Sequence, residues 1–437
     1  MPNMIMPFVM FLFLFGLILL NVPVAFALFF TSMVFGLIFW GWNGLYVTFQ
    51  GVWSLMNNWA LVALPLFVFM SALLEKSGVA DELFTTFYKL LGRIRGSLAV
   101  IAIILGYTIG AMSGVIAAAI ASLALIIYPL MVRHGYDKKL AIGSILAAGT
   151  LPQVVPPSFN MIVYGSVAGV SVGKLFAGGL GVGTVMALVF SIYVLVWSHL
   201  NKDKVPVFAE EEITLKEKII SLKYLIGPLA IILGVLGSIF TGIATPTEAS
   251  GVGAFLSLIY VTVRGKLNRK VMEDSLLVTL KVTSMACWIM AGGSAFSSVF
   301  SGIGGKRLVV DLLMSLPAAK VTVLIFSLAL IFFLGMFVDP VSIIMIMTPI
   351  LTPAVTNLGY DPLWWGVAFT SMLLVSYLTP PVGLGLYYFK GAIDEVSMDE
   401  IYQAVLPFIV LQVIAIVIII LKPEIVLWFI KTLSRGG

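Results

Sequence analysis

The chain has 437 residues, of which 61% are hydrophobic and only 10% are charged, and its mean hydropathy is +1.12. This composition excludes a soluble enzyme and indicates a polytopic membrane protein, because soluble domains are about one quarter charged. The net charge of +5 comes from Lys and Arg in the short connections between apolar runs, where the positive-inside rule places them, so it does not imply a nucleic acid partner.

The chemically reactive residues are few and scattered. The chain has one cysteine, Cys287, and two histidines, His134 and His199, which lie in separate connections. These residues cannot form an internal disulfide and argue against a metal site built from His and Cys. The sequence also has no Ser-His-Asp set and no phosphate-binding Gly-Lys-Ser/Thr loop. We therefore expect no enzymatic activity, no organic cofactor and no pump driven by nucleotide hydrolysis.

The first apolar runs predict three membrane spans, near residues 5–20, 24–40 and 48–74. The N-terminal run lacks the positive segment that begins a secretory signal, so we expect a retained helix rather than a cleaved leader. A basic amphipathic segment with Lys89, Arg93 and Arg95 follows. Its charge places it on the cytoplasmic side.

Two interrupted apolar segments complete the first half. Residues 97–131 are apolar but broken at residues 110–114, and both ends face the cytoplasm in this topology, so we predict a re-entrant hairpin. Residues 140–175 predict a helix that is broken at residues 151–158, where three prolines occur. A last span at residues 178–198 returns to the inside.

The longest polar segment, residues 199–221, predicts a solvated cytoplasmic linker between an N-terminal unit, residues 1–198, and a C-terminal unit, residues 222–437. The second unit repeats the scheme of the first. We predict a hairpin broken at residues 335–340 and a split helix broken at residues 376–383.

An internal repeat supports this division. The tripeptide Gly-Tyr-Asp at residues 135–137 recurs at residues 359–361, 224 residues later. The same spacing relates Ser77-Gly78 to Ser301-Gly302, Pro129 to Pro353, Pro156-Pro157 to Pro380-Pro381, and Tyr164 to Tyr388. A constant spacing over almost ninety residues indicates two copies of one structural unit.

Charge differences between equivalent loops give the relative orientation of the copies. Residues 133–139 carry three fixed positive charges, whereas residues 357–363 carry none. Residues 264–270 are strongly basic, whereas the equivalent residues 40–46 are uncharged. Since Lys and Arg mark cytoplasmic loops, we predict two inverted-topology repeats, each with about five crossings, one re-entrant hairpin and one broken helix.

The four breaks suggest ligand sites. Interrupting a helix inside a membrane frees backbone groups that cost several kcal/mol unless they are satisfied. A single break is more simply a kink, since Gly and Pro are common in membrane helices, but symmetric breaks favour a function. Carbonyl ends and hydroxyls suit a sodium ion, and helix N-termini suit a carboxylate. The first predicted sodium site consists of Ser113, Gly149, Pro152, Val155 and Ser158, and the second of Gly335, Ser376, Thr379 and Val382.

The candidate substrate residues are Asp339, Ser298 and Tyr164. Ionisable residues inside a membrane are functional candidates by default, but Asp339 precedes Pro340 and is equally suited to cap a helix. Ser298 belongs to a run of small residues that favours helix contact over a substrate path. Glu248 follows Thr245 and Pro246, which predicts a helix cap at least as well as a site for a cation.

Three motifs resemble the large membrane subunit, or DctM type, of the tripartite ATP-independent periplasmic (TRAP) transporters. They are Val-Pro-Pro-Ser at residues 155–158, Gly-Ile-Ala-Thr-Pro-Thr-Glu-Ala at residues 242–249, and Leu-Thr-Pro-Pro-Val-Gly at residues 378–383. The resemblance extends over essentially the whole chain. The first hairpin tip departs from the usual Ser-Gly-Ser, since this chain has Ala111-Met112-Ser113-Gly114, and Ser376 stands where Gly is frequent.

The resemblance implies an elevator-type, sodium-driven importer in the bacterial inner membrane. It implies an organic acid substrate of the C4-dicarboxylate or sialic acid class, delivered by a periplasmic binding protein, and a separate small four-helix subunit in the lipid bilayer. The Ser and Thr residues at the breaks favour a hydroxylated acid such as sialic acid. Two alternatives stay open at this point: a carrier or exchanger that needs no binding protein, and a scaffold subunit of a membrane enzyme complex.

Overall fold

The computed structural model describes residues 5–91, 94–206, 214–315 and 317–433, and these residues form helices and the connections between them. The helices of the first half are α1 (Met6–Leu19), α2 (Val24–Trp40), α3 (Trp42–Met56), η2 (Trp59–Val62), α4 (Ala63–Lys76), α5 (Val79–Leu91), α6 (Ser97–Ser113), α7 (Ile116–Arg133), α8 (Lys138–Thr150), η3 (Leu151–Gln153), α9 (Phe159–Ala168) and α10 (Val172–Leu200). Residues 202–204 form η4 (Lys202–Lys204).

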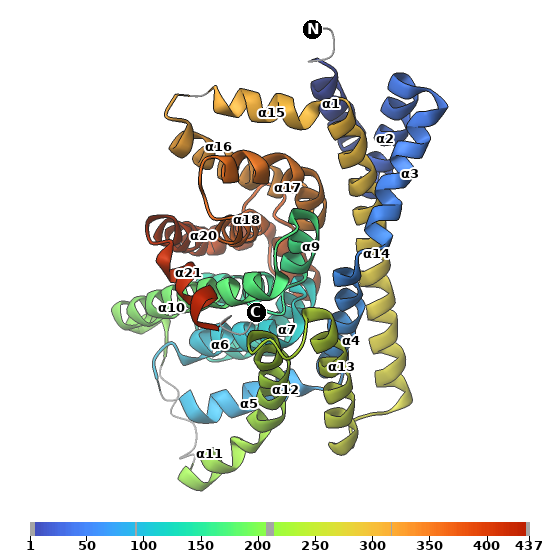
Figure 1. Cartoon of the computed structure of the whole chain (residues 1–437). Coiled ribbons are helices and arrows are strands. Elements are labelled where there is room, and N and C mark those ends of the chain that lie inside the picture. The colour runs from blue at the N-terminus through green and yellow to red at the C-terminus, as the bar shows by residue number, and fades with distance from the viewer. Residues whose placement is uncertain (1–4, 92–93, 207–213, 316, 434–437) are drawn as a thin grey trace.

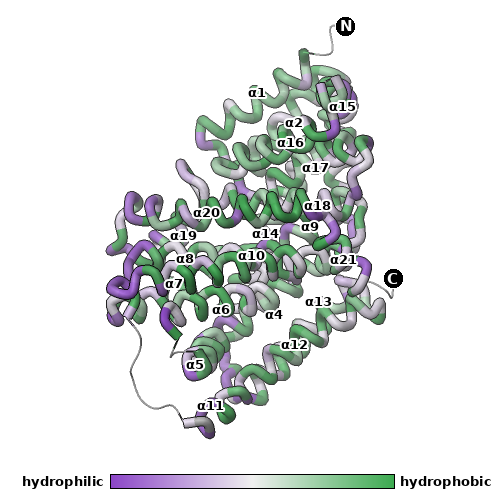
Figure 2. The backbone as a smooth tube through the Cα atoms, turned by 90° about the vertical axis from the view of Figure 1, so that its left-hand side faces the viewer, coloured by the Kyte–Doolittle hydropathy of each residue, from purple (hydrophilic) through white to green (hydrophobic). Residues whose placement is uncertain are grey.

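The rest of the described chain forms the second half. Its helices are α11 (Leu215–Ser221), α12 (Lys223–Phe240), α13 (Pro246–Val263), α14 (Arg269–Gly302), α15 (Gly305–Met314), α16 (Ala319–Gly335), α17 (Pro340–Asn357), α18 (Pro362–Tyr377), α19 (Leu384–Ala392), α20 (Met398–Leu421) and α21 (Glu424–Leu433). In the described part of the chain, seven helices are long and apolar enough to cross a membrane. Figure 2 shows hydrophobic residues along most of the helices and hydrophilic residues mainly near helix ends and connections.

The helices form two bodies. Long α14 packs along α2, α3 and α4, and α4 packs along α13; these helices run together along one side of the molecule in Figure 1. The hairpins α6–α7 and α16–α17 belong to the second body with the broken helices and with α10 and α20. The amphipathic helices α5 and α15 lie at opposite ends of the molecule (Figure 1), as an inverted repeat predicts.

Local chemistry explains the repeated Gly-Tyr-Asp tripeptide. Gly135 and Gly359 have φ values of +73° and +83°, a left-handed conformation that favours glycine after a helix end. Asp137 accepts a hydrogen bond from the Leu140 amide at 3.0 Å, and Asp361 likewise caps α18. Each copy therefore ends one helix and starts the next within three residues.

One predicted span is wrong. The stretch 48–74 is not a single helix, because α3 ends at Met56 and α4 begins at Ala63. Asn58 causes the break: its side chain accepts a hydrogen bond from the Ala60 amide at 3.1 Å and donates one to the Ser166 carbonyl of α9 at 3.3 Å. The equivalent part of the second half, α14, is continuous for 34 residues.

Candidate functional site

The four predicted breaks lie between consecutive helices. The first hairpin turns at residues 114–115 and the second at residues 336–339. The broken helices are interrupted at residues 151–158, where η3 forms, and at residues 378–383. Each of these two interruptions contains a cis Pro-Pro bond, Pro156–Pro157 or Pro380–Pro381.

The first hairpin packs directly on the first broken helix. Gly106 and Gly110 are four residues apart, which places them on one face of α6, and the C-cap Gly114 follows after four more residues. A Cβ atom at Gly110 would lie 3.0 Å from the Pro152 Cα and 3.2 Å from the Val155 Cβ. Small residues let helix backbones approach closely inside a membrane, so this glycine face brings the hairpin to two predicted ligands of sodium site 1.

Two other members of site 1 lie near this contact. Gly149 is buried in the last turn of α8 and faces Ile120 of the second hairpin helix, α7. Ser113 ends α6, one residue before the tip glycine Gly114. The side chain of Ser113 lies outside the part of the chain that the structure describes, so its predicted role as a ligand has no geometry here.

Ser158, the last predicted member of site 1, is fully buried and already has two partners. Its hydroxyl donates to the Gln153 carbonyl and accepts from the Met161 amide at 3.3 Å. These bonds cap the start of α9. Its oxygen therefore has limited capacity for a further ligand.

Sodium site 2 shows the same kind of contact between tip and break. A Cβ atom at Gly335 would collide with the Ser376 hydroxyl, so only a glycine fits here. The Gly383 amide donates to the Met336 carbonyl at 3.2 Å. The tip of the second hairpin is thereby joined to the break of the second broken helix.

The hydroxyls of this site point back along their own helix. Thr379 donates to the Val375 carbonyl at 2.8 Å, and Ser376 donates to the Leu373 carbonyl at 2.9 Å. A hydroxyl that donates one hydrogen bond keeps its lone pairs as acceptors. Val382 lies three residues beyond Thr379, within the same break and one residue before Gly383.

Sequence reasoning missed Gln153, which lies in the first break between Pro152 and Val154. Its side chain is 1% exposed, and neither its Oε1 nor its Nε2 has a hydrogen-bond partner within the described residues. A buried unpaired amide costs about 1–3 kcal/mol. The available signal was an amide residue inside a proline-rich break, and it adds a carbonyl oxygen to the candidate ligands of site 1.

Both hairpin tips and both broken helices meet at one cavity of about 510 Å³. Residues 114–117 and 339–341 line it from the two hairpins, and α2 and α14 form the opposite wall. The four helices that follow the tips and breaks each line this cavity with their first residue, namely Ile116 of α7, Phe159 of α9, Pro340 of α17 and Leu384 of α19, and α2 does so with Val24. These four helix N-termini, with positive dipole ends and amides of which Ser158 and Asp339 each occupy one, thus surround one space.

Asp339 is the charged residue in the wall of this cavity. Its Oδ1 accepts a hydrogen bond from the Ser342 amide at 3.0 Å, and the Ser342 hydroxyl donates to its Oδ2. It therefore caps α17 and also faces the cavity, so the capping role does not exclude the predicted role toward a ligand. Tyr377 and Tyr388 line the same cavity, with ring centroids 6.2 Å apart.

The structure places the other two substrate candidates outside the lining of this cavity. Tyr164 is fully buried, and its hydroxyl is 3.0 Å from Thr352 Oγ1, which ties α9 to α17. Ser298 packs against Gly51 at the contact of α14 with α3, and Ser294 donates to the Gly51 carbonyl at 2.7 Å. These contacts support a packing role for both residues.

The Glu248 motif caps a helix in the structure. Glu248 accepts hydrogen bonds from the Thr245 amide at 2.8 Å and the Thr245 hydroxyl at 2.9 Å, which forms the predicted capping box of α13. Within the described residues, no group of three or more His, Cys, Asp or Glu side chains could hold a metal ion.

Comparisons with known proteins agree with one another. The family model of the tripartite ATP-independent periplasmic transporter, DctM component, matches residues 11–425. The C4-dicarboxylate TRAP transporter large permease protein of Vibrio cholerae is 27% identical and covers 98% of both chains. The ectoine large permease protein of Halomonas elongata is 27% identical over 96% of this chain and 97% of its own. The sialic acid large permease protein of Vibrio cholerae is 26% identical over 94% and 95%.

A solved structure shares the fold. The YdaH transporter of Alcanivorax borkumensis superposes with a TM-score of 0.64 over 91% of each chain, at 13% sequence identity. The family match extends over nearly all of the chain, and seven described helices have the length and composition of membrane spans. The chain is therefore a multi-pass protein of the bacterial inner membrane that belongs to the DctM component family of the TRAP transporters.

Proposed function

We propose that this chain is the permease of a sodium-coupled importer that moves an organic acid anion delivered by a periplasmic binding protein. A separate small membrane subunit completes the complex. The observation that carries the proposal is the cavity of about 510 Å³ on which four helix N-termini converge.

The convergence favours an anionic substrate. Each helix N-terminus carries about half a positive charge and unpaired amides that donate to a carboxylate. Discontinuous helices use this arrangement for anionic groups near the midplane of other transporters. The walls otherwise contain mostly apolar and aromatic side chains, so the helix ends supply most of the attraction for a carboxylate.

The C-terminal ends of the helices that precede the tips and breaks favour a cation beside the substrate. The C-terminal carbonyls of α6 and α8 lie at the first tip and break, and those of α16 and α18 lie at the second. Unpaired carbonyls and hydroxyls are the donors that transporters use for sodium. We propose sodium site 1 around Pro152 and Val155, with the predicted Ser113, Gly149 and Ser158.

Sodium site 2, in the same proposal, consists of Gly335, Ser376, Thr379 and Val382. A cation at site 2 would also offset the negative charge of Asp339, which lies at the same hairpin tip as Gly335 and faces the substrate cavity. A bound acid would otherwise be repelled by this carboxylate. This is a physical reason for coupling: the anion binds well only after the cation has bound.

The named relatives include permeases for C4-dicarboxylate, sialic acid and ectoine. We propose the first two classes as substrates, since both are carboxylates of a size that the cavity can enclose. Movement would be of the elevator kind. The hairpins and broken helices would slide as one body along α2 and α14, which form the other wall of the cavity.

Uptake by proteoliposomes tests the proposal. The permease, its small subunit and its binding protein are reconstituted, and uptake of radiolabelled C4-dicarboxylate or sialic acid is measured with an inward sodium gradient. We expect uptake only with all three components and sodium; potassium in place of sodium is the control. Uptake of free substrate by the permease without the binding protein would favour the stand-alone carrier instead.

An Asp339→Asn variant separates the two roles of this residue. Asn caps helices about as well as Asp, so the fold should persist while the charge is removed. Because the neutral side chain no longer repels the acid, we expect binding of the acid to become at least about tenfold less dependent on sodium, a change of about 1.4 kcal/mol. Unchanged sodium dependence would leave Asp339 with the capping role alone.

A further inference from the structure

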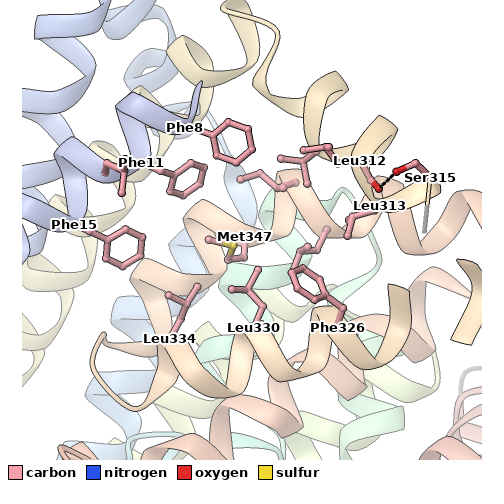
Figure 3. Close-up of a pocket in the computed structure, with 14 residues that line it drawn as sticks. Phe8, Phe11, Phe15, Leu312, Leu313, Ser315, Phe326, Leu330, Leu334 and Met347 are labelled. Atoms are coloured by element: carbon pink, nitrogen blue, oxygen red, sulfur yellow. Dashed lines mark hydrogen bonds between the residues drawn. The ribbon is translucent and has the colours of Figure 1, made fainter. Parts of the chain in front are cut away.

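A second large cavity, of about 550 Å³, lies away from the proposed substrate site. Its walls come from α1, α15, α16 and α17, and Figure 3 shows their side chains turned toward one space. Phe11 of α1, Leu330 of α16 and Met347 of α17 each contribute to one of these walls. Ser315 is the polar residue among its lining side chains, and its hydroxyl already donates to the Leu312 carbonyl at 2.7 Å.

The cavity separates the two bodies of the molecule. On one side, Phe11 of α1 packs edge to face on Phe296 and Phe300 of α14, with ring centroids 5.5 Å and 5.0 Å apart. On the other side, α16 and α17 form the hairpin that carries Asp339 at its tip. An occupant of the cavity would therefore contact both α1 and the second hairpin.

The size and lining of the cavity limit its occupant. The apolar walls offer no partner for a polar solute, whose burial would cost several kcal/mol. A helix about 10 Å wide fills roughly 420 Å³ per turn of 5.4 Å, so the cavity holds little more than one turn. An unbranched hydrocarbon chain has the shape and polarity that fit.

Lys306 supplies the charge expected near a lipid headgroup. It lies on α15 three residues before Val309 and seven before Leu313, so it shares a helix face with two residues that line the cavity. Its side chain is partly buried. Arg307, the next residue, lies on another face, is 89% exposed and pairs with Asp311 at 3.7 Å.

The position of α15 agrees with this assignment. At ten residues the helix is about 15 Å long, too short to cross a hydrocarbon core of about 30 Å. It is amphipathic and follows the end of the long helix α14, and such helices lie at the boundary between headgroups and acyl chains. Lys306 would thus be at phosphate depth while the cavity opens toward the acyl region.

We propose that this cavity binds one acyl chain of a membrane phospholipid and that Lys306 binds the phosphate of the same lipid. The lipid would fill the space between α1 and the second hairpin, at the seam between the two bodies. The site is independent of the proposed substrate and sodium sites, since its lining residues and theirs do not overlap.

Native mass spectrometry of the purified large and small subunit complex tests this proposal. The delipidated complex is titrated with phosphatidylglycerol, and bound lipids are counted. Leu330→Trp fills the cavity, and Met347→Trp fills it from another helix in case the first variant does not fold. Leu229→Trp is the control, because Leu229 is 47% exposed on α12, away from the cavity.

We expect the first phospholipid to bind at least about tenfold more weakly to the two filled variants, because several methylene groups lose their burial. The control should bind as the wild type does. Lys306→Gln should weaken phospholipid binding about fivefold, because one Lys near a lipid surface contributes about 1 kcal/mol of binding free energy. Arg307→Gln should change the binding by less than about twofold.

Three results would overturn the proposal. The first is equal lipid binding by the filled variants and Leu229→Trp. The second is an equal effect of Lys306→Gln and Arg307→Gln. The third is release of the small subunit by the filled variants with lipid binding unchanged, which would make the cavity a protein interface.

Discussion

A single methyl group at Gly110 should separate the first hairpin from the first broken helix. The Cβ atom of a Gly110→Ala variant would lie 3.0 Å from the Pro152 Cα and 3.2 Å from the Pro152 nitrogen. Carbon atoms in contact prefer about 3.5–4.0 Å, so α6 and the break must move apart by a few tenths of an ångström. The obstacle is backbone in a buried break, which cannot rotate aside as a flexible side chain would.

This displacement gives two expected magnitudes. Overpacking in a tight interior costs about 1–3 kcal/mol, so the variant should unfold at a lower temperature. The residues of a binding site tolerate shifts of only about 0.5 Å. The sodium concentration for half-maximal uptake should therefore rise at least about fivefold, which corresponds to a loss of about 1 kcal/mol of sodium binding free energy. Both effects have one cause, the distance between the hairpin tip and residues 152–155.

The assay compares this variant with Gly237→Ala. Gly237 lies in α12, and a Cβ atom there would have no neighbour within 4 Å, so its effect on stability should stay within about 0.5 kcal/mol. Thermal unfolding of the purified complex and the sodium dependence of uptake are measured for both. Identical behaviour of the two variants would refute the reasoning that the hairpin is seated on the break through its glycine face.

Three further predictions concern single side chains. Thr379→Val removes a hydroxyl from sodium site 2 at nearly constant volume, so half-maximal uptake should need about five to tenfold more sodium. Thr262→Val is the control, because the Thr262 hydroxyl also bonds only its own helix. Equal sodium dependence of the two variants would remove Thr379 from the site. Glu82→Gln should lower the free energy of unfolding by about 1–3 kcal/mol, because this carboxylate is only 18% exposed and pairs with Arg264 and Lys266, each at 2.7 Å. The control Glu273→Gln, in an exposed pair, should change the free energy of unfolding by less than about 0.5 kcal/mol. Denaturant titration measures both variants, and a small effect at Glu82 would contradict a stabilising role of its two ion pairs. Tyr164→Phe should cost about 1 kcal/mol of stability and leave the substrate concentration for half-maximal uptake unchanged, while a large rise in that concentration would restore Tyr164 as a substrate residue.

Local signals allowed the breaks to be predicted. Residues 110–114 and 151–158 interrupt their helices because they contain Gly and Pro, and the structure ends α6 at Ser113 and begins α9 at Phe159. The long third span was mispredicted because hydropathy is insensitive to a short break. Asn58 ends that helix partly through a bond to the Ser166 carbonyl of α9, a partner that no local pattern reveals.

The candidate site could be predicted only in part. The breaks identified the segments, and the structure packs Gly335 against Ser376 and Gly110 against Pro152, while the two sodium sites stay a prediction. It places Tyr164 and Ser298 in packing contacts instead. Gln153 was missed because its burial and its unpaired amide depend on neighbours from other helices.

By itself the sequence determined the helix ends marked by Gly, Pro and capping residues, the 224-residue repeat and the membrane environment. These follow from φ angles, capping bonds and hydropathy, which act within a few residues. Only the tertiary structure decided that the starts of α7, α9, α17 and α19 surround one cavity. That convergence depends on packing between segments up to more than two hundred residues apart, and close packing is decided by the shapes of all the neighbours together.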